Sequence, residues 1–214
     1  MTTRTQHATS ACSRILRLVI SLTVSGLALY PIPVLGGDIT AVSVDAASRV
    51  VKLYGAGGIR GLESYQTGIL VSSSGHILTV LSTAIDSEAI DCVLDDGRRY
   101  TASLVGADLH RELAVLKIEG INLPYFKISA DSPRQAIGTR VLALSNLFGV
   151  AVGDERVSIQ HGVVAAHVPL RARRGSHEAA YRGDVYILDC TTNNPGSPGG
   201  CLINWQGDCI GMLG

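Results

Sequence analysis

The segment best suited to chemistry is Asn194–Asn204, which reads NPGSPGGCLIN. Glycine permits positive φ and lets another chain approach the backbone closely, whereas proline fixes φ and removes an N–H donor. A loop of this composition that leads into the apolar pair Leu202–Ile203 can direct backbone amides toward a bound group. The simpler alternative is a tight turn between two strands, and the segment alone favours that alternative.

The composition indicates a folded protein rich in strands and turns. The chain has 214 residues, enough for one or two domains with a hydrophobic core. Hydrophobic residues make up 46% and charged residues 17%, which argues against disorder. The 24 glycines and few aromatic residues suit many short strands joined by tight turns. The formal net charge of zero argues against a nucleic-acid-binding protein that relies on bulk positive charge.

The cysteines do not form a metal-binding pattern. Five are present, with neither a C-x-x-C pair nor a Cys/His spacing suited to zinc, and we expect no metal and no cofactor. Cys12 lies in the N-terminal leader described next. The other four could form two disulfides in an exported protein, with three connectivities, or remain buried free thiols. They are Cys92, Cys190, Cys201 and Cys209.

Residues 1–37 have the pattern of a secretory signal peptide. Three arginines precede the apolar run Leu18–Leu29, which has signal length, and residues 1–37 contain no acidic residue. Pro31 and Pro33 then interrupt a helix, so a full membrane span is less favourable.

Export is therefore the predicted fate of the chain. The small residues of Val34–Gly36 offer a cleavage site, with the alanines at positions 46 and 47 as the second choice. Removal of residues 1–37 leaves 15 basic and 18 acidic residues, a net charge of about −3. We expect a protein of the periplasm, the cell envelope or the extracellular space. An uncleaved N-terminal membrane anchor is the alternative.

Short apolar segments separated by turn signals fill the chain from Arg49 onward. Ser73–Gly75 and Asp95–Gly97 have the composition of hairpin turns. Regular spacing without long helical periodicity indicates a barrel or a sandwich. The strands predicted in the first half are Val50–Tyr54, Gly68–Ser72, His76–Leu81, Ile90–Leu94, Tyr100–Val105 and Leu113–Ile118.

The second half repeats this pattern after a connection with two prolines, Glu119–Arg134. Residues 205–208 have the composition of a turn in the last hairpin. The predicted strands are Arg140–Leu144, Val157–Val168, Val185–Cys190, Cys201–Ile203 and Cys209–Leu213.

Taken together, segments in both halves resemble the HtrA-type, trypsin-like serine proteases. The matching segments, in the family's order, are GILVSSSGHILT (68–79), DGRRY (96–100), VGAD (105–108), ELAVLKI (112–118), ALSNLFG (143–149), VSIQHGVVAA (157–166) and NPGSPGG (194–200). The resemblance implies an all-β fold of two six-stranded β-barrels, one over residues 49–125 and one over residues 126–214, with the active cleft between them. The family continues with a further strand beyond Gly214, so a truncated C-terminal barrel that lacks its last strand is one expectation.

All three catalytic positions implied by the resemblance are substituted. The reaction needs a serine that attacks, a histidine that takes its proton, and a carboxylate that orients the histidine. The family's histidine position holds Ser82, whose hydroxyl does not accept a proton near neutral pH. The family's aspartate position holds Glu112, which keeps the charge on a longer side chain. The nucleophile position holds Pro198, which has no hydroxyl.

The oxyanion loop is altered as well. In the family, the N–H at the nucleophile position and the N–H of the glycine two residues earlier, Gly196 here, form the oxyanion hole. Pro198 has no N–H, and loss of one such donor costs about 3 kcal/mol of transition-state stabilisation. Proline also disfavours the α region for Ser197, which changes the expected shape of the loop up to Gly199.

Ser197 is the alternative nucleophile, because it precedes the family's serine position by one residue. The spacing to Gly199–Gly200 matches without a shift, so its side chain is expected to point away from the cleft. A relocated base would also be needed. Surface or core roles are the simpler interpretation of the available histidines, which are His76, His110, His161, His167 and His177.

The sequence thus predicts an exported HtrA-like serine protease homologue without proteolytic activity. Its partners are extended peptides or unfolded protein segments bound in the cleft between the barrels, not nucleic acid, and an oligomer is compatible with this role. The alternative is a serine endopeptidase with an unusual site that uses Ser197. A third hypothesis is a structural module of the cell envelope.

Overall fold

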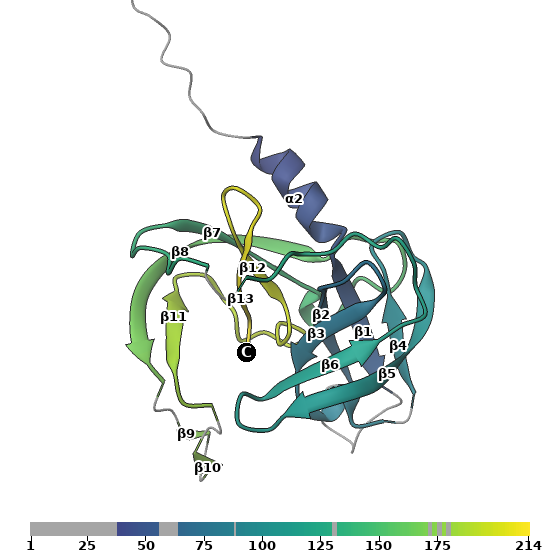
Figure 1. The fold of residues 1–214 in the computed structure, drawn as a ribbon. Coiled ribbons are helices and arrows are strands. Elements are labelled where there is room, and N and C mark those ends of the chain that lie inside the picture. Colours follow the sequence, from purple (N-terminus) through teal and green to yellow (C-terminus); the bar gives the residue numbers. More distant parts are fainter. Residues whose placement is uncertain are drawn as a thin grey trace, which may run out of the picture. The chain divides into compact units, whose positions relative to one another are not determined.

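Most of the regular secondary structure in the described part of the chain consists of strands, which form two main groups (Figure 1). The computed structural model describes residues 38–55, 64–87, 89–129, 132–170, 173–174, 177–178 and 181–214. These residues belong to one compact unit, residues 37–214. The predicted signal peptide, residues 1–37, lies outside the described residues.

A short helix, α2 (Ile39–Ala47), precedes the first strand. Asp38 caps it, because its carboxylate accepts a 3.0 Å hydrogen bond from the N–H of Thr40. Ala46 and Ala47 at its last turn are fully buried, and the helix lies beside the hairpin of β12 and β13 (Figure 1). Among the described residues, no helix has the length and apolar character needed to cross a membrane.

The first half closes into a six-stranded antiparallel barrel, as predicted. Inward and outward side chains alternate in β3 and β6, and the inward ones build one apolar core. The order around the barrel is β1-β2-β3-β6-β5-β4. The strands are β1 (Val50–Gly55), β2 (Tyr65–Leu70), β3 (His76–Val80), β4 (Ile90–Val93), β5 (Arg99–Asp108) and β6 (Leu113–Lys117).

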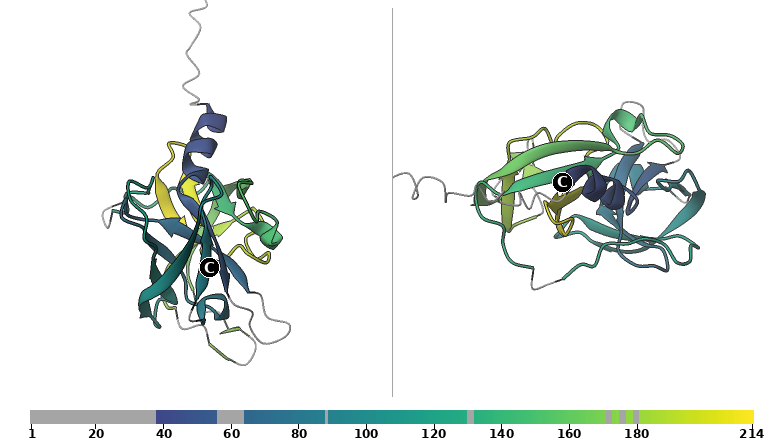
Figure 2. Two further views of the ribbon diagram at one scale, coloured as in Figure 1. Left: turned by 90° about the vertical axis from the view of Figure 1, so that its right-hand side faces the viewer. Right: turned by 90° about the horizontal axis from the view of Figure 1, so that it is seen from above.

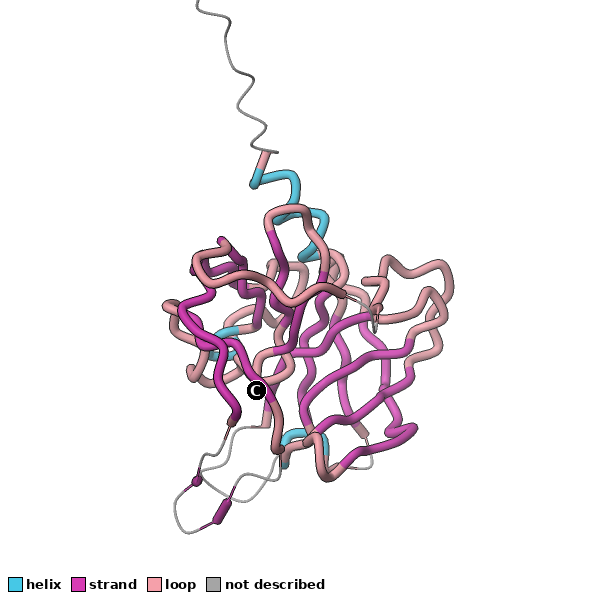
Figure 3. Tube along the Cα trace, turned by 60° about the vertical axis from the view of Figure 1, so that its left-hand side comes forward, coloured by secondary structure: helices cyan, strands magenta, loops and turns pink. Residues whose placement is uncertain are grey.

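The second half forms a curled sheet of five strands in the order β11-β8-β7-β12-β13. Figures 2 and 3 show this sheet beside the first barrel from other directions. Among the described residues this sheet curls but does not close into a barrel. Its strands are β7 (Arg140–Ser145), β8 (Ser158–Pro169), β11 (Asp184–Leu188), β12 (Cys201–Asn204) and β13 (Cys209–Met212).

Two kinds of short element accompany these strands in the described residues. The 3-10 turns η1 (Thr83–Ile85) and η2 (Leu147–Gly149) follow β3 and β7. A small ribbon pairs β9 (Arg173–Arg174) with β10 (His177–Glu178). Each of the eleven strands predicted from the sequence overlaps an observed strand, whereas α2, β9 and β10 were not predicted.

A loop of the second half, residues 151–155, is fastened to the outside of the first barrel. The side chain of Lys52 in β1 is fully buried, and its Nζ donates to the carbonyl oxygens of Gly153 at 2.7 Å and Glu155 at 2.8 Å. Burial lowers the pKa of this amine. Two more side chains of the first barrel donate to carbonyl oxygens of the same loop: Tyr54 to Ala151 and Arg99 to Val152.

Candidate active site

Ser82 lies just past the end of β3, where the chain turns into η1. It is the N-cap of this turn, because its Oγ accepts a 3.1 Å hydrogen bond from the N–H of Ala84. The same hydroxyl donates a 2.5 Å hydrogen bond to Oε1 of Gln66 in β2. The Ser82 hydroxyl therefore donates one hydrogen bond and accepts another, both within the fold.

Gln66 is the centre of a buried polar chain behind Ser82. Its Nε2 donates to Oγ1 of Thr79 at 2.7 Å and to the carbonyl oxygen of Val80 at 2.9 Å. Thr79 Oγ1 in turn donates to the carbonyl oxygen of Thr67 at 2.6 Å. The side-chain polar atoms of Gln66 and Thr79 are thus hydrogen-bonded, as buried polar groups require.

Glu112 faces the end of β3 from the turn before β6. Its carbonyl oxygen accepts a 2.8 Å hydrogen bond from the N–H of Leu81, next to Ser82. Its φ is +53°, in the left-handed region that most side chains avoid, and the residue is exposed. A carboxylate that orients a catalytic histidine is buried beside it, whereas Glu112 lies at the surface.

The loop before β12 folds on itself and then onto the first barrel. The N–H of Ser197 donates to the carbonyl oxygen of Asn194 at 3.0 Å, and the N–H of Gly200 donates to the carbonyl oxygen of Ser197 at 2.9 Å. The carbonyl oxygen of Pro198 accepts a 3.0 Å hydrogen bond from the N–H of Thr67 in β2. Pro198 is half-buried at this junction of the two halves.

Two glycines permit this close approach. Gly196 and Gly199 have φ values of +83° and +80°. A Cβ at Gly196 would lie 2.0 Å from the carbonyl oxygen of Asn146, and a Cβ at Gly199 would lie 2.0 Å from that of Thr67. The loop therefore needs glycine at both positions for conformation and for space.

Thr67 joins the loop to the neighbouring strand ends. Its Oγ1 donates to the carbonyl oxygen of Gly196 at 2.7 Å and accepts from the N–H of Asn146 at 2.9 Å. Residues 66 and 67 in β2 thus contact both parts of the candidate site, with Gln66 bonded to Ser82 and Thr67 bonded to the Gly196–Pro198 segment.

The three positions aligned with a catalytic triad are neighbours in space. Leu81, directly before Ser82, donates its N–H to the carbonyl oxygen of Glu112. Ser82 itself is bonded to Gln66, and the next residue, Thr67, is bonded to Pro198. The three positions that the resemblance aligns with a catalytic triad carry a serine, a glutamate and a proline. Pro198 has no backbone N–H, so this position of the loop offers no main-chain donor.

Ser197 points into the protein. The residue is fully buried, and its Oγ has no hydrogen-bond partner among the described residues. No histidine of the described part therefore activates this hydroxyl through a hydrogen bond.

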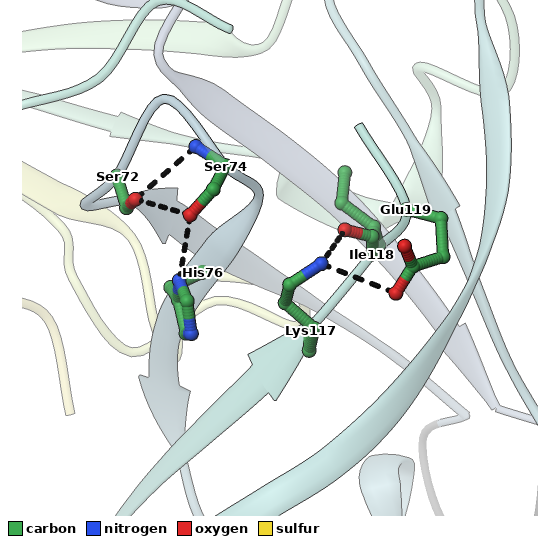
Figure 4. A network of polar contacts seen from close by, with 6 residues as sticks. All are labelled: Ser72, Ser74, His76, Lys117, Ile118 and Glu119. Atoms are coloured by element: carbon green, nitrogen blue, oxygen red, sulfur yellow. Dashed lines mark hydrogen bonds and ion pairs between the residues drawn. The ribbon is translucent and has the colours of Figure 1, made fainter. Parts of the chain in front are cut away.

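The histidines described in full serve other contacts. His76 Nδ1 lies 3.2 Å from Oγ of Ser74, within a surface turn at the far end of β3 from Ser82 (Figure 4). Its strand partner Lys117 bonds to the carbonyl of Ile118 (Figure 4). The other three are placed as follows: His161 packs edge-on against Trp205, His167 packs edge-on against Tyr186, and His110 lies in the turn between β5 and β6.

No group of three or more metal-ligating side chains forms a cluster within the described ranges. The cysteines of these ranges are free thiols, and Cys201 and Cys209 lie side by side. Sequence reasoning missed Gln66 and Thr67, because the predicted strand began only at Gly68. The signal available in the sequence was the polar pair Gln66–Thr67 directly before the apolar residues of the predicted strand. This pair belongs to β2.

Comparison with known proteins agrees with this fold. The family model of the trypsin-like peptidase domain matches residues 66–212. A probable periplasmic serine endoprotease, DegP-like, of Chlamydia pneumoniae is 34% identical over 146 residues, covering 68% of this chain and 28% of that protein. The protein of the same description from Pseudomonas putida is 32% identical over 156 residues, covering 72% and 29%.

Two solved protease structures share this fold. A serine endoprotease from Yersinia pestis superposes with a TM-score of 0.62 at 28% identity, covering 82% of this chain and 57% of that one. A variant of the HtrA-type protease AlgW with a tripeptide gives a TM-score of 0.66 at 30% identity, covering 82% and 54%.

The fold and the matched domain place the chain in the trypsin-like peptidase class of proteins. Within that class, the chain belongs to the HtrA-type family. It spans less than a third of the length of the curated relatives that it matches.

Proposed function

We propose that this protein is an exported HtrA-like homologue without peptidase activity that binds extended polypeptide in the cleft between its two halves. The observation that supports the proposal is the set of hydrogen bonds that connects the segments of Ser82, Glu112 and Pro198, the positions that the resemblance aligns with a catalytic triad. A site with the right placement but without its reacting groups retains a capacity for binding only.

The hydrogen bonds of Ser82 support the loss of chemistry. Its Oγ is engaged with Gln66 and with the N–H of Ala84, so it is a structural cap rather than a proton acceptor. Pro198 offers neither a hydroxyl nor an N–H to a tetrahedral intermediate. Together these features remove the nucleophile, the base and one oxyanion donor.

The burial of Ser197 argues against the enzyme alternative. Attack by its Oγ on a peptide carbonyl would require the 194–200 loop to unfold, because the side chain is fully enclosed. That loop is held by hydrogen bonds from Thr67 and from Leu213, which connect it to β2 and to the end of β13.

Peptide binding is supported by the fold and by one relative. The HtrA-type protease AlgW has been solved with a tripeptide. Strand addition recognises the backbone of an extended segment and does not need a catalytic triad. We therefore propose extended peptides or unfolded protein segments as partners, and an oligomeric assembly is compatible with this role.

Export is the proposed location. Relatives from Chlamydia pneumoniae and Pseudomonas putida are described as periplasmic. Residues 1–37 have the sequence pattern of a signal peptide. An N-terminal membrane anchor in place of a cleaved signal is the alternative.

A labelling experiment separates the binding protein from the enzyme. The purified protein is treated with a fluorescent serine-reactive phosphonate and, in parallel, with unfolded casein. We expect no labelling and no cleavage. Labelling and cleavage that both disappear in Ser197→Ala would overturn the proposal in favour of a serine endopeptidase.

A binding experiment tests the cleft directly. Fluorescence anisotropy of a labelled unfolded polypeptide is measured with Gly196→Ala and with Gly138→Ala. Both glycines have positive φ, +83° and +87°, but only at Gly196 would the new Cβ meet other atoms within 4 Å. We expect Gly196→Ala to lose affinity and Gly138→Ala to retain it. Equal binding by folded samples of both variants would place the polypeptide outside the cleft.

A further inference from the structure

Two free thiols meet across the last hairpin of the chain. Cys201 is the first residue of β12, and Cys209 is the first residue of β13. Their sulfur atoms are 3.5 Å apart, with Cys201 donating to Cys209. Both side chains belong to the apolar cluster beneath α2. The other two cysteines of the described ranges lie in different places, Cys92 in β4 and Cys190 after β11.

The strand register explains why these two sulfur atoms meet. Cys201 is opposite Met212, while Cys209 is opposite Ile203, so the cysteines are diagonal neighbours. The register shifts between Leu202 and Ile203, and such a bulge increases the local twist of the two strands. A disulfide requires sulfur atoms about 2.05 Å apart, so these must approach by only about 1.5 Å.

We propose that Cys201 and Cys209 are a redox pair, which closes to an intramolecular disulfide and fastens β12 to β13. The inference does not depend on whether the cleft binds polypeptide. It depends on the separation of the two sulfur atoms, on their shared face of the hairpin and on the access to one of them.

The two thiols differ in exposure to solvent, and this difference indicates which of them reacts first. Cys209 is half-buried, whereas Cys201 is fully buried. The hydrogen bond from Cys201 lowers the pKa of the Cys209 thiol, and burial raises the pKa of the Cys201 thiol. Cys209 is therefore the attacking thiol and Cys201 the resolving thiol.

The oxidant is a small-molecule or protein disulfide. The Cys209 thiolate attacks one sulfur of the oxidant, forms a mixed disulfide and releases the first thiol. The sulfur of Cys201 then attacks Cys209, loses its proton and displaces the second thiol. The two cysteines lose two electrons and two protons together, and the oxidant is reduced to two thiols.

The disulfide would act next to the altered catalytic loop. The N–H of Gly199 donates to the carbonyl oxygen of Leu213 at 2.8 Å, and the N–H of Leu213 donates to the carbonyl oxygen of Gly200 at 2.8 Å. The loop of residues 196–200 is thus anchored on the same two strands that the disulfide would join. Closure of the pair is expected to slow local opening of this loop.

The experiment uses the full chain with Cys190→Ser, which keeps the proposed pair and removes a confusing thiol. An endoproteinase that cuts before aspartate separates residues 189–207 from residues 208–214, and these peptides then carry only Cys201 and only Cys209. The protein is equilibrated with glutathione of increasing disulfide content, blocked with N-ethylmaleimide under denaturing conditions, digested and analysed by mass spectrometry.

We expect the two peptides to become linked and two thiols to be lost together, in the wild type and in Cys190→Ser. The midpoint of thermal unfolding should then rise on oxidation. In the double variant Cys190→Ser with Cys209→Ser, neither change should occur. Because Cys209 is half-buried, this variant is expected to fold, which its reduced unfolding curve checks.

Three results would overturn the proposal. Folded Cys190→Ser could remain fully reduced in glutathione disulfide, or it could keep glutathione on Cys209 without closing the link. In the wild type, a link that disappears in Cys190→Ser would assign the disulfide to Cys190 instead.

Discussion

The hydroxyl of Ser82 donates a 2.5 Å hydrogen bond to Oε1 of Gln66, a side chain that is 2% exposed. This bond joins the end of β3 to β2 at the position where the family places its catalytic histidine. The same Gln66 amide donates to Thr79 and to the carbonyl of Val80, so one buried amide is satisfied from three sides. The position that the resemblance aligns with the catalytic base is therefore held by hydrogen bonds of the fold.

Ser82→Ala should therefore destabilise the protein. It removes an N-cap and leaves the buried Oε1 of Gln66 without its donor, which together should lower the free energy of unfolding by about 2 kcal/mol. Urea unfolding measures the change. The control is Ser48→Ala, which removes only a local bond to the carbonyl of Asp45 and should change stability by less than about 0.5 kcal/mol. Equal effects would mean that the bond from Ser82 to Gln66 contributes nothing.

Lys52→Met should loosen the attachment between the first barrel and the second half. It removes two hydrogen bonds to the carbonyl oxygens of Gly153 and Glu155, but it also removes the cost of burying a charge. The net effect should be a fall of about 2 kcal/mol in the free energy of unfolding. Lys127→Met, at an exposed position, is the matched control and should have little effect. Unfolding in urea at neutral pH compares the two.

The same pair of variants gives a pH test. Burial lowers the pKa of Lys52 below 10.5, so the folded chain releases this proton at a lower pH than the unfolded chain. The unfolded state then binds more protons, and the contribution of Lys52 to stability rises as the pH rises toward 10.5. The stability difference between wild type and Lys52→Met should therefore increase with pH. A constant difference would mean that the amine has an ordinary pKa.

Cys92 should make the protein sensitive to alkali. Burial in β4 raises the pKa of its thiol from 9.0 to about 12. The stability that depends on the neutral thiol is complete below pH 9.0 and is lost as the pH rises toward 12. At pH 10.5 the loss should be about 2 kcal/mol, since one pKa unit corresponds to about 1.4 kcal/mol. Cys92→Ala should be less stable at neutral pH but should show a smaller decline with pH than the wild type.

The strands were predictable from sequence because their signals are local. Short apolar segments between turn residues predict a strand, and hairpin turns such as 73–75 and 95–97 separate neighbouring strands. The helix α2 was missed because its stability comes from tertiary contacts. Its last turn is held by the burial of Ala46 and Ala47 in the core. The local sequence does not indicate this burial.

The candidate site was only partly predictable. The resemblance pointed to Ser82, Glu112 and Pro198, and hydrogen bonds connect the segments that carry them. The bond between Ser82 and Gln66 could not be predicted, because it crosses between strands and depends on which way each side chain points. The burial of Ser197 agrees with the expected direction of its side chain, since the positive φ of Gly196 and of Gly199 fixes the turn around it.

The structure narrows the range of positions at which we expect cleavage of the predicted signal peptide. Cleavage at Ala46 or Ala47 would cut a helix that is packed on the core, so we expect the mature chain to begin at or before Asp38. Intact-mass analysis of the protein from the cell envelope checks this. Retention of Met1 in soluble cytoplasmic protein would contradict export, whereas an intact chain in the membrane fraction would indicate the anchor.

The final prediction concerns the recovery of catalysis. Pro198→Ser alone should be silent, because its hydroxyl would have no base, and Ser82→His alone should be silent, because its imidazole would have nothing to activate. Members of such a unit are strongly non-additive. Glu112→Asp supplies the family's carboxylate, and aspartate tolerates the left-handed φ at this position better than glutamate does.

Only the triple variant, with Ser82→His, Glu112→Asp and Pro198→Ser, should hydrolyse fluorogenic casein. Its matched control replaces Pro198 with alanine, which restores the backbone N–H without a hydroxyl and should remain silent. Activity in the triple variant and not in this control would show that the three positions form a degenerate triad around an intact Gly196 amide. A folded but silent triple variant would mean that the loop no longer presents that amide, because all three side chains would then be in place without an oxyanion hole.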